Sequence, residues 1–327
     1  MPRLLYITLL LIVFTGESLA QADYAIMFYN VENLFDCEDD SLKFDEEFLP
    51  NGNKHWSNYR LYNKIKGISK TILAANQWNS PAIIGLCEIE NENTLKKLIY
   101  STGLSNLGYR YIHYESMDKR GIDVALLYKK GIFNLLSSAP IPQSDSTNHF
   151  YTRDALYVKG VIATDTLHIV VNHWPSKRGG ELASEIKRER VAQAVTIKID
   201  SIRSKEKAPK LVVLGDFNAE LNAPSIKYLL AHSNLDTKLK LSSIRTDAIQ
   251  GSHKYLGHWS LIDHLFLSAD WLSNPAYSFD HKIVNLPNLL EDDKTYSGLK
   301  PRRTYAGPRY IGGVSDHLPV IVNIKKK

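Results

Sequence analysis

Cysteine is scarce in this chain, and its scarcity excludes two classes of protein. Only Cys37 and Cys87 occur among the 327 residues. Two thiols make neither a disulfide framework nor a zinc site built from several cysteines. In an oxidising compartment the two could still pair. Cys87 ends an apolar run, however, which predicts a small buried residue instead.

The chain also lacks internal repeats and low-complexity linkers, and after its first twenty residues no segment is apolar enough to cross a membrane. The first twenty residues are different. Arg3 precedes an apolar run that ends at Phe14, and Ser18-Leu19-Ala20 offers a small-residue cleavage site. This pattern is typical of a secretory signal peptide, and the run is short for a transmembrane helix. No cysteine follows the cleavage site, which disfavours a lipoprotein anchor.

We therefore expect residues 1–20 to be a signal peptide and residues 21–327 to form a single domain. This mature chain is predicted to be secreted or periplasmic, with no transmembrane anchor and no evident stable protein partner. Its length is sufficient for one large α/β domain. The formal net charge of +5 and the pI of about 8.9 suit a phosphate-bearing partner but do not require one.

Apolar runs rich in β-branched residues recur along the chain and predict strands that are buried on both faces. These runs cover residues 24–31, 82–87, 124–128, 156–163, 167–171, 211–214, 261–267 and 318–324. Helical spacing predicts one apolar face at Leu61, Ile65, Ile68 and Ile72, and a longer one at Leu182, Ile186, Val191, Val195, Ile199 and Ile202. Neighbouring runs such as 156–163 and 167–171 resemble hairpins, so mixed sheets covered by helices fit better than one parallel sheet.

An acidic segment, DCEDDSLKFDEE, occupies residues 36–47. The simplest interpretation is a solvated loop. A structural calcium ion or a second magnesium ion is the alternative, although the spacing matches no EF-hand loop.

Polar side chains stand at the ends of six of the predicted strands. In α/β sheets, ligand sites gather where strand ends meet loops. A set made only of Asp, Glu, Asn and His predicts a hard-cation site, because oxygen ligands favour magnesium, manganese or calcium over zinc. The strand-end residues are Asn30, Glu32, Glu88, Asn172, His173, Asp216, Asn218, Asp263, His264, Asp316 and His317.

The stretch KLVVLGDFNAE, residues 210–220, shows the pattern most clearly. Four aliphatic residues precede a glycine, a carboxylate and an amide. We expect Gly215 to let the chain turn tightly, so that Asp216 and Asn218 face a bound phosphate.

Six motifs along the chain together resemble the endonuclease/exonuclease/phosphatase superfamily, the DNase I-like group. They are NVEN at 30–33, CEIEN at 87–91, NHWPSKRGG at 172–180, GDFNAE at 215–220, LIDHLFLS at 261–268 and GGVSDHLPV at 312–320. They span nearly all of the mature chain, and the NHWPSK variant is closest to bacterial secreted members. The resemblance implies a four-layer α/β sandwich, in which two mixed β-sheets pack face to face with helices outside.

The same resemblance assigns roles to individual residues. It implies that Glu88 and Asn30 bind the metal, with help from Asp316 and Glu32. It implies catalytic roles for His173, Asp216, Asn218, Asp263 and His317, in which Asp263 pairs with His317 and Asp123 orients His173. It implies phosphate or substrate contacts for Arg153 and Asn218, to which Lys177 and Arg309 are added as basic candidates near the motifs.

The chemistry of phosphodiester hydrolysis calls for these residue types. A divalent ion, here Mg²⁺ or Mn²⁺, neutralises the phosphate and stabilises the leaving oxygen. A carboxylate or imidazole takes the proton of the attacking water, and an imidazolium or arginine stabilises the transition state. We therefore predict a secreted, metal-dependent phosphodiesterase, a nuclease of DNA or RNA with little sequence specificity.

Three alternatives remain at this stage: a phosphomonoesterase, a sphingomyelinase-like phospholipid diesterase, and a non-catalytic binding protein. The pattern around LIDHLFLS departs from that of inositol phosphatases, and no aromatic hairpin for membrane docking is obvious. The segment LKPRRTYAGPRY, residues 299–310, interleaves cations with tyrosines, which suits nucleic-acid backbones and stacked bases or simply a soluble loop. Residues 251–260 are a second candidate for a substrate-side loop.

Overall fold

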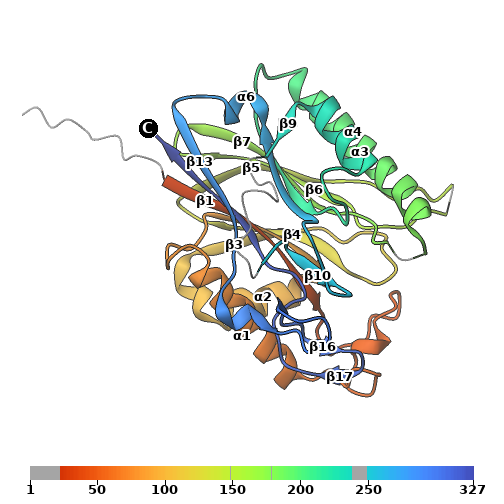
Figure 1. Ribbon diagram of the computed structural model, residues 1–327. Helices are drawn as coiled ribbons and strands as arrows, with labels where there is room; N and C mark the ends of the chain where they lie inside the picture. Colours follow the sequence, from red (N-terminus) through yellow and green to blue (C-terminus); the bar gives the residue numbers. More distant parts are fainter. Residues whose placement is uncertain (1–22, 148, 178, 238–248) are drawn as a thin grey trace, which may run out of the picture.

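Two six-stranded sheets lie face to face between two layers of helices in the computed structural model (Figure 1). The structure describes residues 23–147, 149–177, 179–237 and 249–327. The predicted signal peptide lies outside these residues. The prediction of a four-layer α/β sandwich with two mixed sheets is confirmed.

The first sheet has the strand order β13-β18-β1-β2-β4-β3. Strands β1 and β2 are parallel and the other neighbours are antiparallel, so the sheet is mixed. Its strands are β1 (Asp23–Leu34), β2 (Ile83–Ile89), β3 (Tyr109–His113), β4 (Asp123–Lys129), β13 (Tyr277–Ile283) and β18 (Val320–Lys326).

The second sheet has the order β5-β6-β7-β8-β12-β9, and only β7 and β8 run parallel. The expected hairpin is present as the antiparallel pair β6–β7. The strands are β5 (Phe133–Ile141), β6 (Ala155–Ile162), β7 (Asp165–His173), β8 (Lys210–Asp216), β9 (Leu235–Asp236) and β12 (Asp263–Ser268).

Helices α1 and α2 cover the outer face of the first sheet, and α3 and α4 cover that of the second (Figure 1). The helices are α1 (Asn58–Ala74), α2 (Glu92–Tyr100), α3 (Glu181–Arg203), α4 (Pro224–Ser233) and the short α6 (Ala269–Leu272). Three single-turn 3₁₀ segments are η1 (Glu46–Phe48), η2 (Gly103–Leu107) and η3 (Pro287–Leu289). Three small hairpins complete the fold: β10 (His253–Tyr255) with β11 (His258–Ser260), β14 (Leu290–Asp292) with β15 (Leu299–Pro301), and β16 (Tyr305–Ala306) with β17 (Arg309–Tyr310). None of the helices in the described residues combines the length and the apolar character that a membrane span needs.

The predicted apolar face of α1 is buried along its whole length. In α3 the prediction is wrong at its first two positions, because Leu182 and Ile186 are exposed. The step of five residues from Ile186 to Val191 breaks the helical repeat. Ser184 and Arg188 occupy the buried face in their place.

Gly215 lies inside β8, where it permits a close approach between strands and makes no turn. A Cβ atom at this position would lie 2.4 Å from the carbonyl oxygen of Asn172 on the neighbouring strand β7. The expected tight turn is formed instead by Asn218, whose φ is +50°. Gly85 of β2 has a similar role between the sheets, since its Cβ would lie 2.3 Å from Leu214 Cδ1.

Replacement of Gly215 by alanine is expected to destabilise the protein by about 1–3 kcal/mol, because the added methyl group meets backbone that cannot move without disturbing the β7–β8 pairing. Chemical denaturation of Gly215→Ala measures the effect. Gly103→Ala is the matched control, because its φ lies outside the left-handed region and its Cβ would meet only the side-chain ends of Leu73 and Ser69, at 3.3 and 4.0 Å. An equal free energy of unfolding in Gly215→Ala and the wild type would contradict the role of Gly215.

Candidate active site

The register of the second sheet places three predicted site residues in one row. Asp216 of β8 is paired with His173 on the parallel strand β7 and with Asp263 on the antiparallel strand β12. All three side chains are buried. In the first sheet, Asn30 of β1 is paired with Cys87 of β2, the residue before Glu88.

Irregular backbone turns the remaining side chains toward this row. The pairings of β2 with β1 and with β4 both shift at Glu88, which is the mark of a β-bulge. Glu32, Asn33, Glu88 and Asn218 all have φ between +50° and +63°, a region that non-glycine residues rarely adopt. Such strain clusters at functional sites. These four strained residues, at the ends of β1 and β2 and just after β8, therefore mark this end of the sandwich.

The two sheets meet at Asn30. Its Nδ2 lies 3.0 Å from Asp216 Oδ2 and 3.5 Å from Glu88 Oε1. The other Glu88 oxygen accepts a 2.7 Å hydrogen bond from the backbone N–H of Asn33. Nε2 of His173 lies 3.9 Å from oxygens of both Glu88 and Asp216. Two carboxylates and an amide thus converge, and no lysine or arginine of the described residues is paired to either carboxylate. This donor set fits a hard divalent cation.

His317 is held by Asp263 and faces Asp216. Its Nδ1 lies 2.7 Å from Asp263 Oδ2, and its Nε2 lies 3.8 Å from Asp216 Oδ2. Burial alone would disfavour a charged imidazole, but the carboxylates of Asp263 and Asp216 outweigh it and raise the pKa of His317 well above its usual value. His317 is therefore an imidazolium at neutral pH.

His173 is in the opposite state. Burial and the neighbouring Arg153 lower its pKa well below the usual value, so the imidazole is neutral. Nη2 of Arg153 lies 2.8 Å from His173 Nε2, and Nη1 of Arg153 donates to Asp118 Oδ2 at 3.3 Å. The prediction that Asp123 orients His173 is wrong, because Asp123 lies beside His113 and accepts a hydrogen bond from the N–H of Ser116. The segment between β3 and β4 supplies Asp118 for this purpose, through Arg153.

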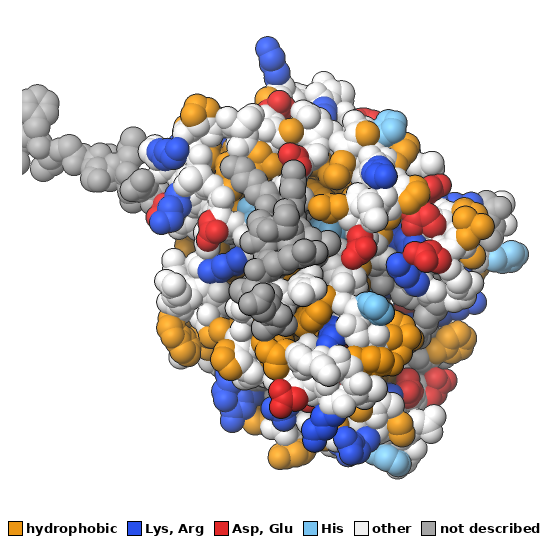
Figure 2. Space-filling view, in the orientation of Figure 1, with side chains coloured by type: hydrophobic (Ala, Val, Ile, Leu, Met, Phe, Trp, Pro, Cys, Tyr) orange, Lys and Arg blue, Asp and Glu red, His pale blue; other side chains and the backbone are white. Residues whose placement is uncertain are grey.

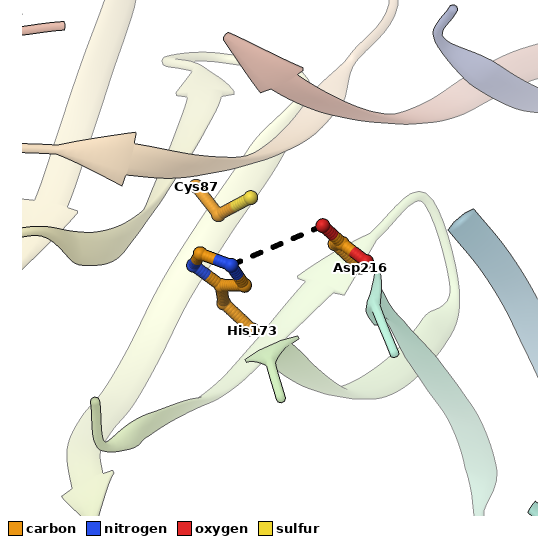
Figure 3. A group of neighbouring side chains, drawn as sticks. All are labelled: Cys87, His173 and Asp216. Atoms are coloured by element: carbon orange, nitrogen blue, oxygen red, sulfur yellow. Dashed lines mark ion pairs between the residues drawn. The ribbon is translucent and has the colours of Figure 1, made fainter. Parts of the chain in front are cut away.

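Cys87 also points into the centre, beside His173 and Asp216 (Figure 3). Burial raises the pKa of its thiol well above the usual value, and the nearby carboxylates of Asp216 and Glu88 add to this. The thiol therefore stays protonated and is a poor ligand. Cys37 and Cys87 are not paired with each other.

Two predicted metal ligands, Glu32 and Asp316, already form hydrogen bonds or ion pairs with other residues. Glu32 Oε2 accepts a 2.7 Å hydrogen bond from the N–H of Thr304 and lies 4.0 Å from the buried ammonium of Lys64. Asp316 Oδ2 accepts a 2.8 Å hydrogen bond from Arg303 Nη2, while its other oxygen lies 3.9 Å from His317 Nε2. These contacts fasten the segment after β15 to the site. Glu88 and Asp216 are paired with no lysine or arginine of the described residues, so their oxygens are more open to a cation than those of Glu32 and Asp316.

In the acidic segment, where the sequence left calcium binding open, two carboxylates accept hydrogen bonds from protein groups. Asp36 accepts hydrogen bonds from the side-chain amides of Asn91 and Asn93 and from the N–H of Glu38. Asp45 accepts one from the N–H of Asp40. The compact groups of potential ligands found among the described residues do not include residues 36–47. Calcium binding there stays a prediction.

A cavity of about 870 Å³ opens over this centre. Arg153 and Asn218 lie at its wall, and Lys177 lies at its rim in an ion pair with Glu181. Arg309 lies on the exposed strand β17 and does not line the cavity. Several lining residues lie outside the six motifs, namely Lys54, Arg120, Tyr255, Arg303 and Tyr305. Tyr255 falls in the predicted substrate-side segment 251–260, and Arg303 and Tyr305 fall in the basic and aromatic segment 299–310. Lys54 and Arg120 were not predicted from the sequence.

The hairpin β10–β11 forms part of the mouth of the cavity. Tyr255 and Leu256 at its tip are 65% and 57% exposed, so a hairpin with an apolar tip is present where none was obvious from the sequence. His253 lies deeper, with its ring centre 4.7 Å from that of His317. Residues 251–260 therefore lie on the substrate side.

The charge of the surface is mixed on the face seen in Figure 2, where basic, acidic and hydrophobic side chains are interspersed. The basic residues that bear on function are those that line the cavity.

Comparisons with solved structures give the fold of several relatives. The chain is similar to the human Nocturnin catalytic domain, solved with a bound sulfate anion, at 21% identity and a TM-score of 0.56, covering 94% of this chain and 96% of that one. It is similar to a mannosyl-6-phosphatase of Bacteroides thetaiotaomicron at 15% identity and a TM-score of 0.57, covering 92% and 99%. It is also similar to truncated TDP2 of Caenorhabditis elegans at 14% identity and a TM-score of 0.56, covering 93% and 98%. These likenesses show a shared fold.

No curated protein sequence matches the chain. The sequence model of the endonuclease/exonuclease/phosphatase family matches residues 25–326, nearly the whole described domain. Members of this superfamily hydrolyse phosphoester bonds and generally use divalent metal ions. The chain belongs to the endonuclease/exonuclease/phosphatase family.

Proposed function

We propose that the protein is a secreted, Mg²⁺- or Mn²⁺-dependent phosphodiesterase, and specifically a nuclease that cleaves DNA or RNA with little sequence specificity. The observation that carries this proposal is the convergence of two imidazoles on Asp216, with His173 Nε2 at 3.9 Å and His317 Nε2 at 3.8 Å from its Oδ2. Their surroundings shift the pKa of His173 down and that of His317 up. Groups whose surroundings push their pKa values apart are suited to different acid–base roles.

Glu88, Asn30 and Asp216 would hold the ion, whose charge neutralises the phosphate and stabilises the leaving oxygen. Asp216 also orients the attacking water and accepts its proton. Asn218, whose N–H donates to Asp216 Oδ1 at 2.9 Å and which lines the cavity, would contact the phosphate. The imidazolium of His317 and the guanidinium of Arg153 stabilise the negative charge that develops on the phosphoryl oxygens.

The rim of the cavity favours a polymeric substrate. Arg120, Lys177 and Arg303 line the cavity, where Lys177 is paired with Glu181 and Arg303 with Asp316. Tyr255, 65% exposed, supplies an aromatic face at the mouth. Cations suit successive backbone phosphates, and tyrosine rings suit stacked bases whatever their identity. Contacts of this kind do not depend on base identity, which supports low sequence specificity.

Two other substrate classes have support from specific observations. The apolar tip of the β10–β11 hairpin at the cavity mouth would suit a phospholipid diesterase. The structural similarity to a mannosyl-6-phosphatase supports a phosphomonoesterase as an alternative function. A non-catalytic binding protein is disfavoured, since Glu88, Asp216 and His317 are all present and converge.

Asp216→Ala is expected to lower hydrolysis by about a hundredfold to ten-thousandfold, because it removes a metal ligand and the water-activating group together. The variant and the wild type are assayed with Mg²⁺ on DNA, RNA, a sugar phosphate and sphingomyelin. Asp280→Ala, on the exposed part of β13, is the matched control. Wild-type turnover in Asp216→Ala would refute the site, whereas turnover of only the sugar phosphate or sphingomyelin would refute the nuclease assignment.

Asp263→Asn is expected to move the alkaline limb of the pH–rate profile to lower pH by about one to three units. The raised pKa of His317 keeps its imidazolium, and the activity that depends on it, up to high pH. Activity is lost as pH rises through that pKa. Removal of the Asp263 charge lowers this pKa, so the loss comes earlier. The pH dependence of kcat/KM measures the shift, and an unmoved alkaline limb would show that the His317 charge is not required.

Secretion predicts a mature N-terminus at Gln21, with residues 21–327 as one catalytic domain. Mass spectrometry of the protein recovered from the periplasm or medium of a bacterial host reports the first residue. An intact N-terminus at Met1 in a cytoplasmic fraction would contradict the proposed localisation.

A further inference from the structure

Among the described residues, four compact groups of potential metal ligands are present. Three of them contain residues of the active site. The fourth, His113, Glu115 and Asp123, lies between the end of β3 and the start of β4, and none of its members lines the cavity.

Two atoms in this fourth group are buried without a hydrogen-bond partner among the described residues. They are Nε2 of His113 and Oδ1 of Asp123, and the side chains of both residues are only 2% exposed. Nε2 of His113 lies 3.8 Å from Oδ2 of Asp123, which is too long for a hydrogen bond. Two ligands of one tetrahedral ion lie about 3.4 Å apart when each is about 2.1 Å from the metal. The spacing therefore suits two groups that share an ion.

Charge in the group points the same way. Burial, together with the negative charge of Glu115, raises the pKa of Asp123 to about 7. Burial lowers the pKa of His113 to about 4, so its imidazole is neutral and free to act as a ligand. Glu92 and Asp40 add further negative charge near the group. The Asp123 carboxylate is buried, and a buried carboxylate is costly unless it is protonated or paired with a cation.

The nearby lysine does not fill this role. Nζ of Lys43 donates to the carbonyl oxygens of Ser116 and Asp118 at 2.9 and 3.1 Å, and within the described part of the chain no ion pair joins it to Glu115 or Asp123. The charge of Lys43 lowers the pKa of Glu115 and Asp123, but burial raises it more, so both pKa values remain above their usual range. Lys43 therefore leaves both carboxylates without a lysine in contact.

We propose that His113, Glu115 and Asp123 form a second metal site, separate from the active site, that takes a divalent transition-metal ion such as Zn²⁺. An imidazole ligand favours Zn²⁺ over Mg²⁺ and Ca²⁺, which prefer all-oxygen sites. Glu115, whose side chain is 57% exposed, closes the site from the solvent side, and water completes the coordination.

The position of this site gives it a structural consequence for the active site. Two of its ligands, His113 and Asp123, flank residues 114–122, a segment that includes Glu115, Asp118 and Arg120. Asp118 holds Arg153 against His173, and Arg120 donates from Nη2 to Asn33 Oδ1 at 2.5 Å. An ion at one end of this segment would fasten a loop that positions residues at the cavity wall.

The test is the number of Zn²⁺ ions bound per chain, measured by isothermal titration calorimetry in excess Mg²⁺, which occupies the oxygen-rich centre around Asp216. The wild type is expected to bind one more Zn²⁺ than either His113→Gln or Glu115→Gln, and to gain thermal stability from it. Glu115→Gln changes a largely exposed side chain, so its loss of binding is not explained by a failure to fold.

His232→Gln and Glu38→Gln are the matched controls, because both replace exposed residues away from the group. They are expected to bind Zn²⁺ as the wild type does. The same stoichiometry and the same Zn²⁺-dependent rise in Tm in all five proteins would overturn the proposal. Since the readout is binding and not turnover, it is independent of which substrate the active site accepts.

Discussion

The contact between Asn30 and Asp216 is the point on which the site depends, because it joins the two sheets. Asn30 belongs to β1 of the first sheet and Asp216 to β8 of the second, yet their side chains are 3.0 Å apart. Glu88 reaches the same place from a bulge in β2. One sheet thus supplies Asn30 and Glu88, and the other supplies His173, Asp216 and Asp263. The site exists only where the sandwich is correctly stacked.

Electrostatics then separates two otherwise similar residues. His173 and His317 are both buried within 4 Å of Asp216. Burial and then Arg153 lower the pKa of the first, whereas Asp263 and Asp216 raise the pKa of the second against the effect of burial. A phosphodiester needs both a group that accepts a proton and a fixed positive charge. Histidine serves in both places because the two have differently charged neighbours: the cation Arg153 beside His173 and the anion Asp263 beside His317.

Sequence reasoning recovered the central strands and missed those at the edges. Central strands are buried on both faces and read as apolar runs, as β8 and β2 do. Strands β3, β5 and β13 lie at sheet edges, and their exposed positions and the Pro140 of β5 hide the pattern. Side chains placed by sheet register, such as His173, Asp216 and Asp263, were predictable from strand ends. Those placed by loops, such as Arg120 and Asp118, were not, because loop conformation depends on tertiary contacts that leave no periodic signal.

The division between sheets and loops has an evolutionary consequence. The groups proposed to act on the phosphate sit on strand ends fixed by the core, where Gly85 and Gly215 permit a close approach that a Cβ atom would block. The groups that would meet the rest of the substrate sit on small hairpins, β10–β11 and β16–β17, which the sheets do not constrain. A lineage can therefore exchange these hairpins and acquire new substrates while the same hydrolytic centre is inherited unchanged.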